Sequence, residues 1–81
     1  MHELWNNCLH SVAKEVTPHS FETWFSALIP TTLTNNTLTI CTPDQFYCQW
    51  VSRHYQPLLE RCLQEISGSP ISISFVVDSS H

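Results

Sequence analysis

The segment 17–28 concentrates three aromatic rings and a leucine at helical spacing. Its apolar residues recur at i, i+3, i+4 and i+7, and they are Phe21, Trp24, Phe25 and Leu28. This spacing places all four side chains on one side of an α-helix. Thr17 is a suitable N-cap, and Pro18 fits the first helical position, where an N–H group is not needed. Because burying one large apolar side chain contributes roughly 1.5–3 kcal/mol, we predict that the other elements pack around this helix.

A preceding helix is predicted over residues 3–16, where apolar residues form two adjacent rows at i and i+4. Trp5 lies near the N-terminal edge of this stripe. A large ring beside a frayed helix end is often only half covered. Trp5 is therefore a candidate partner site, and packing in the core or at its rim is the alternative.

A β-hairpin is predicted for residues 29–41, with its turn at Asn35-Asn36, because Asn tolerates positive φ and the residues after the turn alternate in polarity. Pro30 has no N–H group to donate, which places the first strand at a sheet edge or delays its start to Thr31. Residues 71–77 also alternate between apolar and polar side chains, and they predict a third strand that joins the hairpin.

The segment 42–45 predicts the start of a long helix. Gln45 lies three residues after Thr42, as in a capping box, and Asp44 in the first turn suits the helix macrodipole. The helical stripe continues until the segment 67–70 ends it. Pro57 removes one hydrogen bond inside this stripe, which predicts a kink or a break near Tyr55-Gln56.

Phe46 stands early in this long helix, so its ring can lie partly outside the core and contact a partner. A hydrophobic staple or a core position is the alternative for the same residue.

The predicted order is helix, helix, strand, strand, helix, strand. This order indicates an α+β domain of two layers, in which a three-stranded sheet packs on helices. A chain of 81 residues has the size of one domain. We place this domain at residues 1–77, and we read residues 78–81 as the start of a polar linker or tail.

The sequence lacks the motifs that several classes of function require. The single glycine, Gly68, excludes a P-loop and a dinucleotide-binding turn, both of which need several glycines. The histidines show no i, i+4 pair and the cysteines no C-x-x-C spacing, so we predict neither a metal nor a cofactor. Cys48 and His54 stand six residues apart, which directs them to different sides of a helix and argues against a nucleophile pair.

The four cysteines, Cys8, Cys41, Cys48 and Cys62, each have apolar neighbours. We read them as separate core residues that stay reduced in a cytoplasmic protein, with disulfides as the alternative. No apolar run reaches the length of a membrane span, so no membrane partner is expected. The net charge of −4 opposes tight binding to a phosphate backbone.

Five motifs in order carry a resemblance to a known family. They are Leu4-Trp5, Phe21-x-x-Trp24-Phe25, Asn36-Thr37-Leu38, Pro43-x-x-Phe46-x-x-x-Trp50-Val51 and Tyr55. Their joint spacing, over residues 3–77, resembles the N-terminal domain of the bacterial chromosome replication initiator DnaA. The resemblance implies a fold similar to a KH-type module and a role without catalysis. It also implies that ATP binds a separate AAA+ domain, so that this segment needs no cofactor.

The resemblance further implies self-association, recruitment of the replicative helicase DnaB, and contact with initiation regulators. Trp5 matches the aromatic that supports self-association, and Phe46 matches an exposed aromatic that contacts helicase and regulators. Some family members carry an acidic helicase contact where this chain has Ser20. Glu22 is the nearest carboxylate, but it lies roughly 200° around the helix from that position.

A weak single-stranded nucleic-acid module is the alternative function, with aromatic rings as stacking platforms. Such a module needs a basic groove, and only Lys14, Arg53 and Arg61 can supply one. The chain also lacks the G-x-x-G loop of nucleic-acid-binding KH domains.

Overall fold

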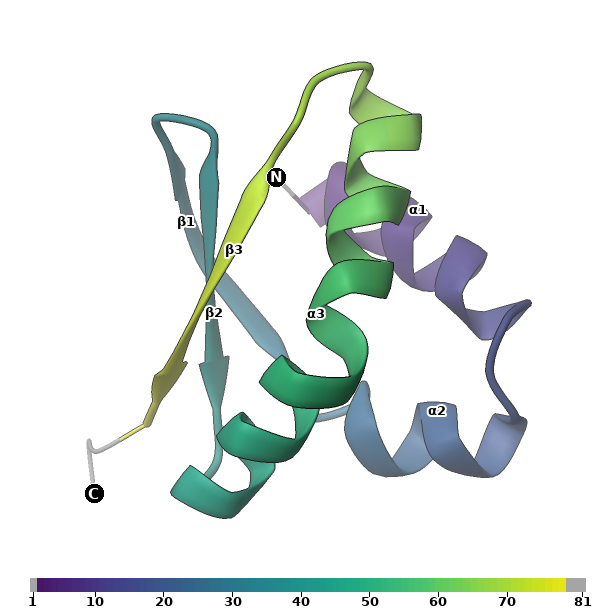
Figure 1. The fold of residues 1–81 in the computed structure, drawn as a ribbon, viewed down its shortest axis with the longest axis vertical. Coiled ribbons are helices and arrows are strands. Elements are labelled where there is room, and N and C mark those ends of the chain that lie inside the picture. The colour runs from purple at the N-terminus through teal and green to yellow at the C-terminus, as the bar shows by residue number, and fades with distance from the viewer. Residues whose placement is uncertain (1, 79–81) are drawn as a thin grey trace.

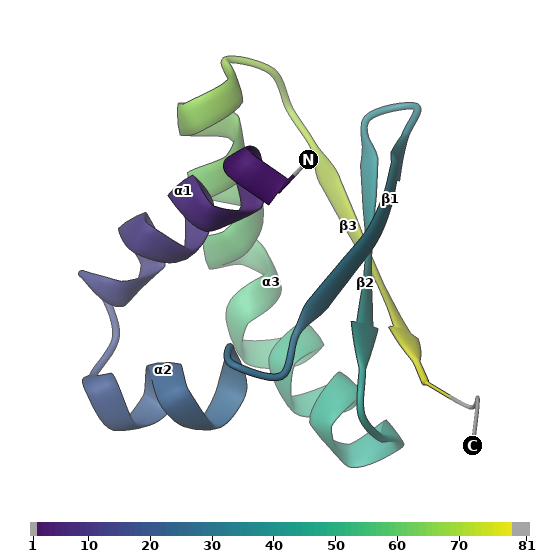
Figure 2. The same cartoon turned by 180° about the vertical axis from the view of Figure 1, so that it is seen from behind.

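The computed structural model describes residues 2–78. Its elements are α1 (His2–Ala13), α2 (Pro18–Trp24), β1 (Ile29–Thr34), β2 (Thr37–Thr42), α3 (Gln45–Ser67) and β3 (Ser72–Val77). Figures 1 and 2 show the three helices on one side of the molecule and the sheet on the other. The predicted element order and the two-layer α+β class are confirmed. Of the tail predicted for residues 78–81, all but Asp78 lies outside the described residues.

The sheet has the strand order β1-β2-β3, with β1 antiparallel and β3 parallel to the central β2. The hairpin turn lies at Asn35 and Asn36, whose φ angles of 53° and 61° are both positive. Two successive positive φ angles match the twist of a tight hairpin. Pro30 lies in an edge strand, as predicted, and the register shifts between Pro30 and Thr32.

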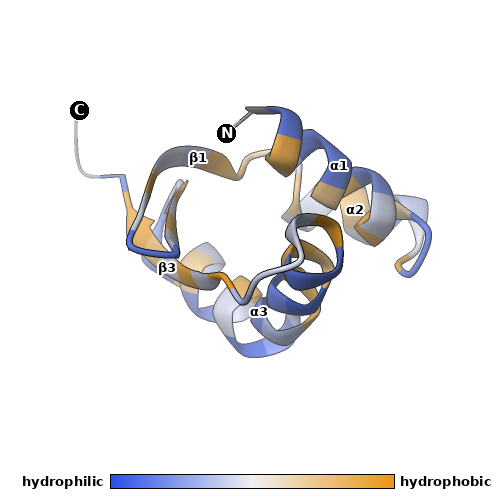
Figure 3. Cartoon of the chain, turned by 90° about the horizontal axis from the view of Figure 1, so that it is seen from above, coloured by the Kyte–Doolittle hydropathy of each residue, from blue (hydrophilic) through white to orange (hydrophobic). Residues whose placement is uncertain are grey.

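One face of the sheet is buried against the helices. Leu38, Ile40 and Thr42 alternate along β2 with half-buried neighbours, so the period-two pattern of this strand is confirmed. Figure 3 shows α1 and α3 facing the sheet from the opposite side. The buried apolar residues form one core: Trp5, Cys8, Val12, Phe25, Leu28, Leu38, Ile40, Val51, Leu59, Cys62, Leu63, Ile71 and Ile73.

The first two helices end earlier than predicted. The α-helical part of α1 stops at Ala13, where the Lys14 N–H group bonds the Ser11 carbonyl in a tighter turn. The helix α2 stops at Trp24, although Thr17 caps its start as predicted by accepting the Ser20 N–H. Phe25 and Leu28 are buried after the helix ends, whereas no residue within α2 is buried. The prediction that the other elements pack around this helix is therefore wrong.

The long helix begins two residues later than the capping-box pattern predicts. Thr42 remains in β2, and its buried hydroxyl donates to the Val76 carbonyl at 2.8 Å. Asp44 is the N-cap instead, since its carboxylate accepts the Tyr47 N–H at 2.8 Å. Thr42 therefore makes a buried hydrogen bond to β3 and does not cap α3 as its sequence pattern predicts.

Pro57 lies inside α3 without breaking it. The helix runs continuously, and its axis bends between the two halves in Figures 1 and 2. Proline removes one N–H group and crowds the preceding turn, which produces a bend when the flanking turns are held by packing. The kink is thus confirmed and the break is wrong. The helix ends at Gly68, whose φ of 79° is the left-handed cap conformation.

Candidate functional site

The solvent-facing side of the N-terminal half of α3 carries two large aromatic side chains. Phe46 is 69% exposed and Trp50 is 37% exposed. Arg53 and His54, both exposed, continue the same side one turn beyond Trp50. A helix normally turns charged and polar residues toward water. Exposed rings at these positions indicate a surface that a partner covers.

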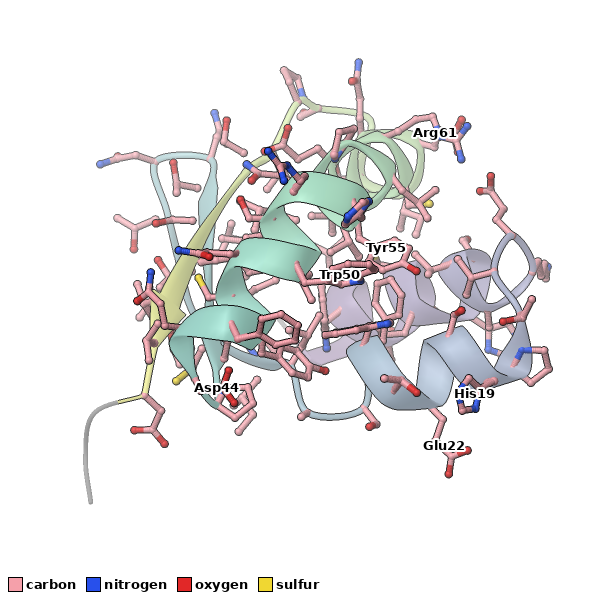
Figure 4. The ribbon with its side chains drawn as sticks, turned by 60° about the horizontal axis from the view of Figure 1, so that its bottom comes forward. His19, Glu22, Asp44, Trp50, Tyr55 and Arg61 are labelled. Atoms are coloured by element: carbon pink, nitrogen blue, oxygen red, sulfur yellow. The ribbon has the colours of Figure 1, made fainter. Side chains whose placement is uncertain are left out.

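The Trp24 ring connects this side of α3 to α2. Its centroid lies 5.1 Å from that of Trp50, with nearly parallel planes, and 6.3 Å from that of Phe46. The centroid of the His54 ring lies 4.1 Å from that of Trp50. We call Trp24, Phe46, Trp50 and His54 the aromatic patch. Figure 4 shows Trp50 in the space between α3 and α2.

Partly buried aromatic residues that pack against the core also contact the aromatic patch. The Tyr47 ring lies 5.2 Å from Trp24, and burial raises the pKa of Tyr47. Phe25 and Tyr55 make a second contact between the segment after α2 and α3, at 4.8 Å between centroids. Ring pairs at these separations favour fixed relative orientations. The patch is therefore presented by rigid elements and does not depend on a loop.

The structure brings together only part of the predicted partner-binding set. Phe46 lies in the aromatic patch. Ser20 stands one turn before Trp24 on α2, and its hydroxyl accepts a hydrogen bond from the Thr17 hydroxyl at 3.0 Å. Glu22 is exposed and points away from Trp50 and α3 (Figure 4). Hence Ser20 borders the patch, whereas Glu22 supplies no negative charge there.

Trp5 does not have the half-covered position that its place in the sequence suggests. Its side chain is only 4% exposed and belongs to the core cluster with Cys8 and Val12. The ring is covered because α1 packs along α3 in the tertiary structure, so its nearness to the helix end does not expose it. The core alternative for Trp5 is the one that the structure shows.

Sequence reasoning missed three members of the aromatic patch, Trp24, Trp50 and His54. A signal for two of them was present, because Trp50 and His54 follow Phe46 at i+4 and i+8 and so share its side of α3. Trp24 gave no such signal. Its pattern with Phe25 indicated burial, and only the packing of α2 against α3 shows that it is half-buried at the edge of the patch.

The cysteines and the possible metal ligands are the remaining candidates for chemistry among the described residues. Within residues 2–78 no three His, Cys, Asp or Glu side chains lie together in a way that could hold a metal ion. Cys8 and Cys62 are buried, whereas Cys41 and Cys48 are half-buried, so only two of the four cysteines are core residues as predicted. Burial, together with the neighbouring Cys62, raises the pKa of the Cys8 thiol to about 12. Such a thiol stays protonated and is a poor nucleophile.

None of the described helices has both the length and the apolar character that crossing a membrane requires.

The chain is similar to known proteins both in its sequence and in its fold. The family model of the DnaA N-terminal domain matches residues 2–65. The fold is similar to that of a chain in the crystal structure of a HobA–DnaA (domain I–II) complex from Helicobacter pylori, with a TM-score of 0.77. This similarity covers 93% of this chain and 98% of that chain at 19% sequence identity, so it shows a shared fold. Because the family model covers most of the sequence, the chain belongs to the DnaA N-terminal domain family.

Proposed function

We propose that this domain is a protein-interaction and oligomerisation module of a replication initiator in the cytoplasm. In this proposal it recruits the replicative helicase DnaB and initiation regulators at the chromosome origin, and it catalyses no reaction. The observation that carries the proposal is the aromatic patch, where Phe46 is 69% exposed on the outer side of α3. Exposed aromatic side chains in a rigid setting are the typical anchors of protein interfaces.

The structural neighbour supports a protein partner for this fold. The Helicobacter pylori DnaA chain was solved in a complex with HobA. We propose that a partner of this chain covers the aromatic patch, with Ser20 at its border. Because Ser20 carries no charge where some relatives have a carboxylate, the rings must supply most of the contact energy.

The decisive experiment is an NMR titration of the domain with its cognate replicative helicase, comparing wild type with Phe46→Ala. We expect shifts at Phe46, Trp50 and Ser20 in the wild type and a loss of binding of about tenfold or more in the variant, as for an interface hot spot. Leu33→Ala is the matched control, because Leu33 is also an exposed apolar side chain, at 40%, but lies in β1. Leu33→Ala should bind like the wild type.

If Phe46→Ala bound the helicase as tightly as the wild type, the proposal that the aromatic patch recruits the helicase would be wrong. Both variants should first be shown to be folded by their amide spectra, since Phe46 and Leu33 are surface residues whose removal leaves the core intact.

Self-association is the second part of the proposal, and the burial of Trp5 changes how Trp5 could act in it. Because only 4% of its surface is exposed, Trp5 would act as a positioning residue. Its packing in the core would fix the orientation of α1, whose exposed side includes Asn6. We expect Trp5→Phe to keep self-association and Asn6→Glu to weaken it in sedimentation velocity. Loss of association in a folded Trp5→Phe variant would instead show a direct contact through the Trp5 ring.

The nucleic-acid alternative has weaker support. Of the three cationic side chains, only Arg53 lies on the side of α3 that carries the patch, and Arg61 is paired with Glu15. One cation gives little of the counterion release that drives binding to a phosphate backbone. If a single-stranded oligonucleotide shifted the amide resonances of the patch and the helicase did not, the nucleic-acid function would be favoured over helicase recruitment.

A further inference from the structure

A shallow pocket lies along the exposed side of α3 beside the rings. It is lined by Phe46, Gln49, Trp50, Ser52, Arg53 and His54. The pocket therefore places one guanidinium group next to two exposed aromatic side chains. Trp50 and Arg53 stand one turn apart, and Phe46 stands two turns before Arg53.

Arg53 is the unneutralised cation of this surface. Within residues 2–78 the Arg61 side chain donates to both carboxylate oxygens of Glu15, whereas no carboxylate lies within ion-pair distance of Arg53. The chain carries seven acidic residues against three basic ones. An unpaired arginine in such a chain, on the side that carries the rings, is a feature that the fold itself does not use.

The nearest carboxylates along the chain are occupied or directed elsewhere. Asp44 caps α3 through the Tyr47 N–H. Glu60 accepts hydrogen bonds from the Ile73 N–H and from the Gln56 side chain. Glu22 points away from α3 (Figure 4). Among the residues that line the pocket, Arg53 alone carries a fixed charge, so the charge that a partner can complement there is positive.

We infer that the partner segment bound by this surface is an acidic peptide, with an apolar side chain on Phe46 and Trp50 and a carboxylate on the Arg53 guanidinium. This inference rests on the proposed function and adds the chemistry of the partner to it. Arginine binds carboxylates through paired hydrogen bonds, and neighbouring rings shield that contact from water. Phe46 and Arg53 are seven residues apart on α3, which is a distance of about 10 Å along the helix axis. In our inference the carboxylate of the partner therefore follows its apolar side chain by one to two turns of a partner helix.

The test uses two synthetic peptides of about 15 residues that differ at one position. Both carry leucine and phenylalanine one turn apart, followed one turn later by aspartate in the first peptide and by asparagine in the second. Binding is followed by amide shifts of the wild type, Arg53→Gln and Lys14→Gln. Lys14→Gln is the matched control, because it removes the same charge from an exposed residue outside the pocket.

We expect Arg53→Gln to weaken binding of the aspartate peptide by about tenfold or more, as for a lost charge-assisted hydrogen bond. Lys14→Gln should stay within about twofold of the wild type. The asparagine peptide should bind the wild type and Arg53→Gln equally. Added salt should weaken the aspartate peptide more than the asparagine peptide.

Equal effects of Arg53→Gln and Lys14→Gln, or equal binding of the two peptides, would overturn the inference. So would an oligothymidylate that shifts the pocket residues while neither peptide does. The helicase titration separates this outcome from failure of the proposed function. If Phe46→Ala abolishes helicase binding while Arg53→Gln leaves it unchanged, recruitment stands and the acidic-peptide inference falls.

Discussion

The two halves of α3, on either side of Pro57, both contribute to the core, but they differ in their exposed side chains. Val51 is buried before Pro57, yet only this N-terminal half exposes large aromatic side chains. In the C-terminal half, Leu59 and Leu63 are fully buried against the sheet and α1. In the N-terminal half, Phe46 and Trp50 face outward. One helix therefore supplies both the core of the domain and its candidate binding surface. The difference teaches that hydrophobic content alone does not separate stabilising residues from recognition residues.

The turns of α3 on either side of Pro57 also bind the sheet. Just before and after Pro57, Gln56 and Glu60 hydrogen bond the outer edge of β3, through the carbonyl and the N–H group of Ile73. Unpaired edge groups invite pairing with other chains. The middle of α3 thus completes the fold at this edge, whereas the aromatic side chains near its N-terminus remain available for partners.

The largest expected effect is in the buried half. Leu59→Ala should lower the free energy of unfolding by about 2–5 kcal/mol, because it leaves a cavity in the core. Urea denaturation measures the change, and Leu59→Met, which keeps the volume, should cost less than about 1.5 kcal/mol. A cost of Leu59→Ala below that of Leu59→Met would contradict the assignment of this half to the core.

The contact between α1 and the buried half of α3 should make the fold sensitive to alkaline pH. Burial raises the pKa of Cys8 from its ordinary value of 9.0 to about 12. The folded state thus holds the thiol proton more tightly than the unfolded chain, so this contribution is complete below pH 9 and is lost as pH rises toward 12. We expect a loss of about 2.5 kcal/mol by pH 11.

Denaturation curves at several pH values measure this dependence. Cys8→Ala should show a shallower decline above pH 9, although Cys62 still contributes in the same direction because burial raises its pKa as well. An identical decline in Cys8→Ala and wild type would rule out Cys8 as a source.

A smaller effect is expected at the start of the exposed half. Asp44→Ala removes the acceptor of the Tyr47 N–H and should cost about 1 kcal/mol, whereas Asp44→Asn keeps a capping oxygen and should cost less. Thermal or urea denaturation distinguishes the two. A neutral Asp44→Ala would indicate that the cap contributes nothing to holding the aromatic patch.

The smallest effect on stability is expected at the patch itself. Phe46→Ala should change the free energy of unfolding by less than about 0.5 kcal/mol, because an exposed ring gains little from folding. The same variant should lose partner binding. A stability loss as large as that of Leu59→Ala would erase the contrast between the two halves and make Phe46 a core residue.

Much of the fold could be predicted because local patterns agree with it. The pair Asn35-Asn36 forms the hairpin turn, and Gly68 ends α3, each at a position that demands a positive φ. The helix ends were less predictable, because they depend on which hydrogen-bond partner each capping side chain takes. Thr42, for example, gives its hydroxyl to Val76 and leaves the cap to Asp44.

The site was predictable only through Phe46. Its place in the first turns of α3 favoured exposure as much as burial, and Trp5 had similar alternatives. The structure exposes Phe46 and buries Trp5. Neither result follows from periodicity, since a helical stripe shows which residues share a side but not what covers that side.

The sequence by itself determined the element order, the α+β class and the family, because backbone preferences and the spacing of apolar residues act over a few residues. Only the tertiary structure decided which rings lie outside, how Trp24 joins Trp50 across two helices, and which arginine has no carboxylate partner within residues 2–78. Those properties depend on distances between residues far apart in the chain. They are settled when the helices and the sheet pack together and leave one side of α3 uncovered.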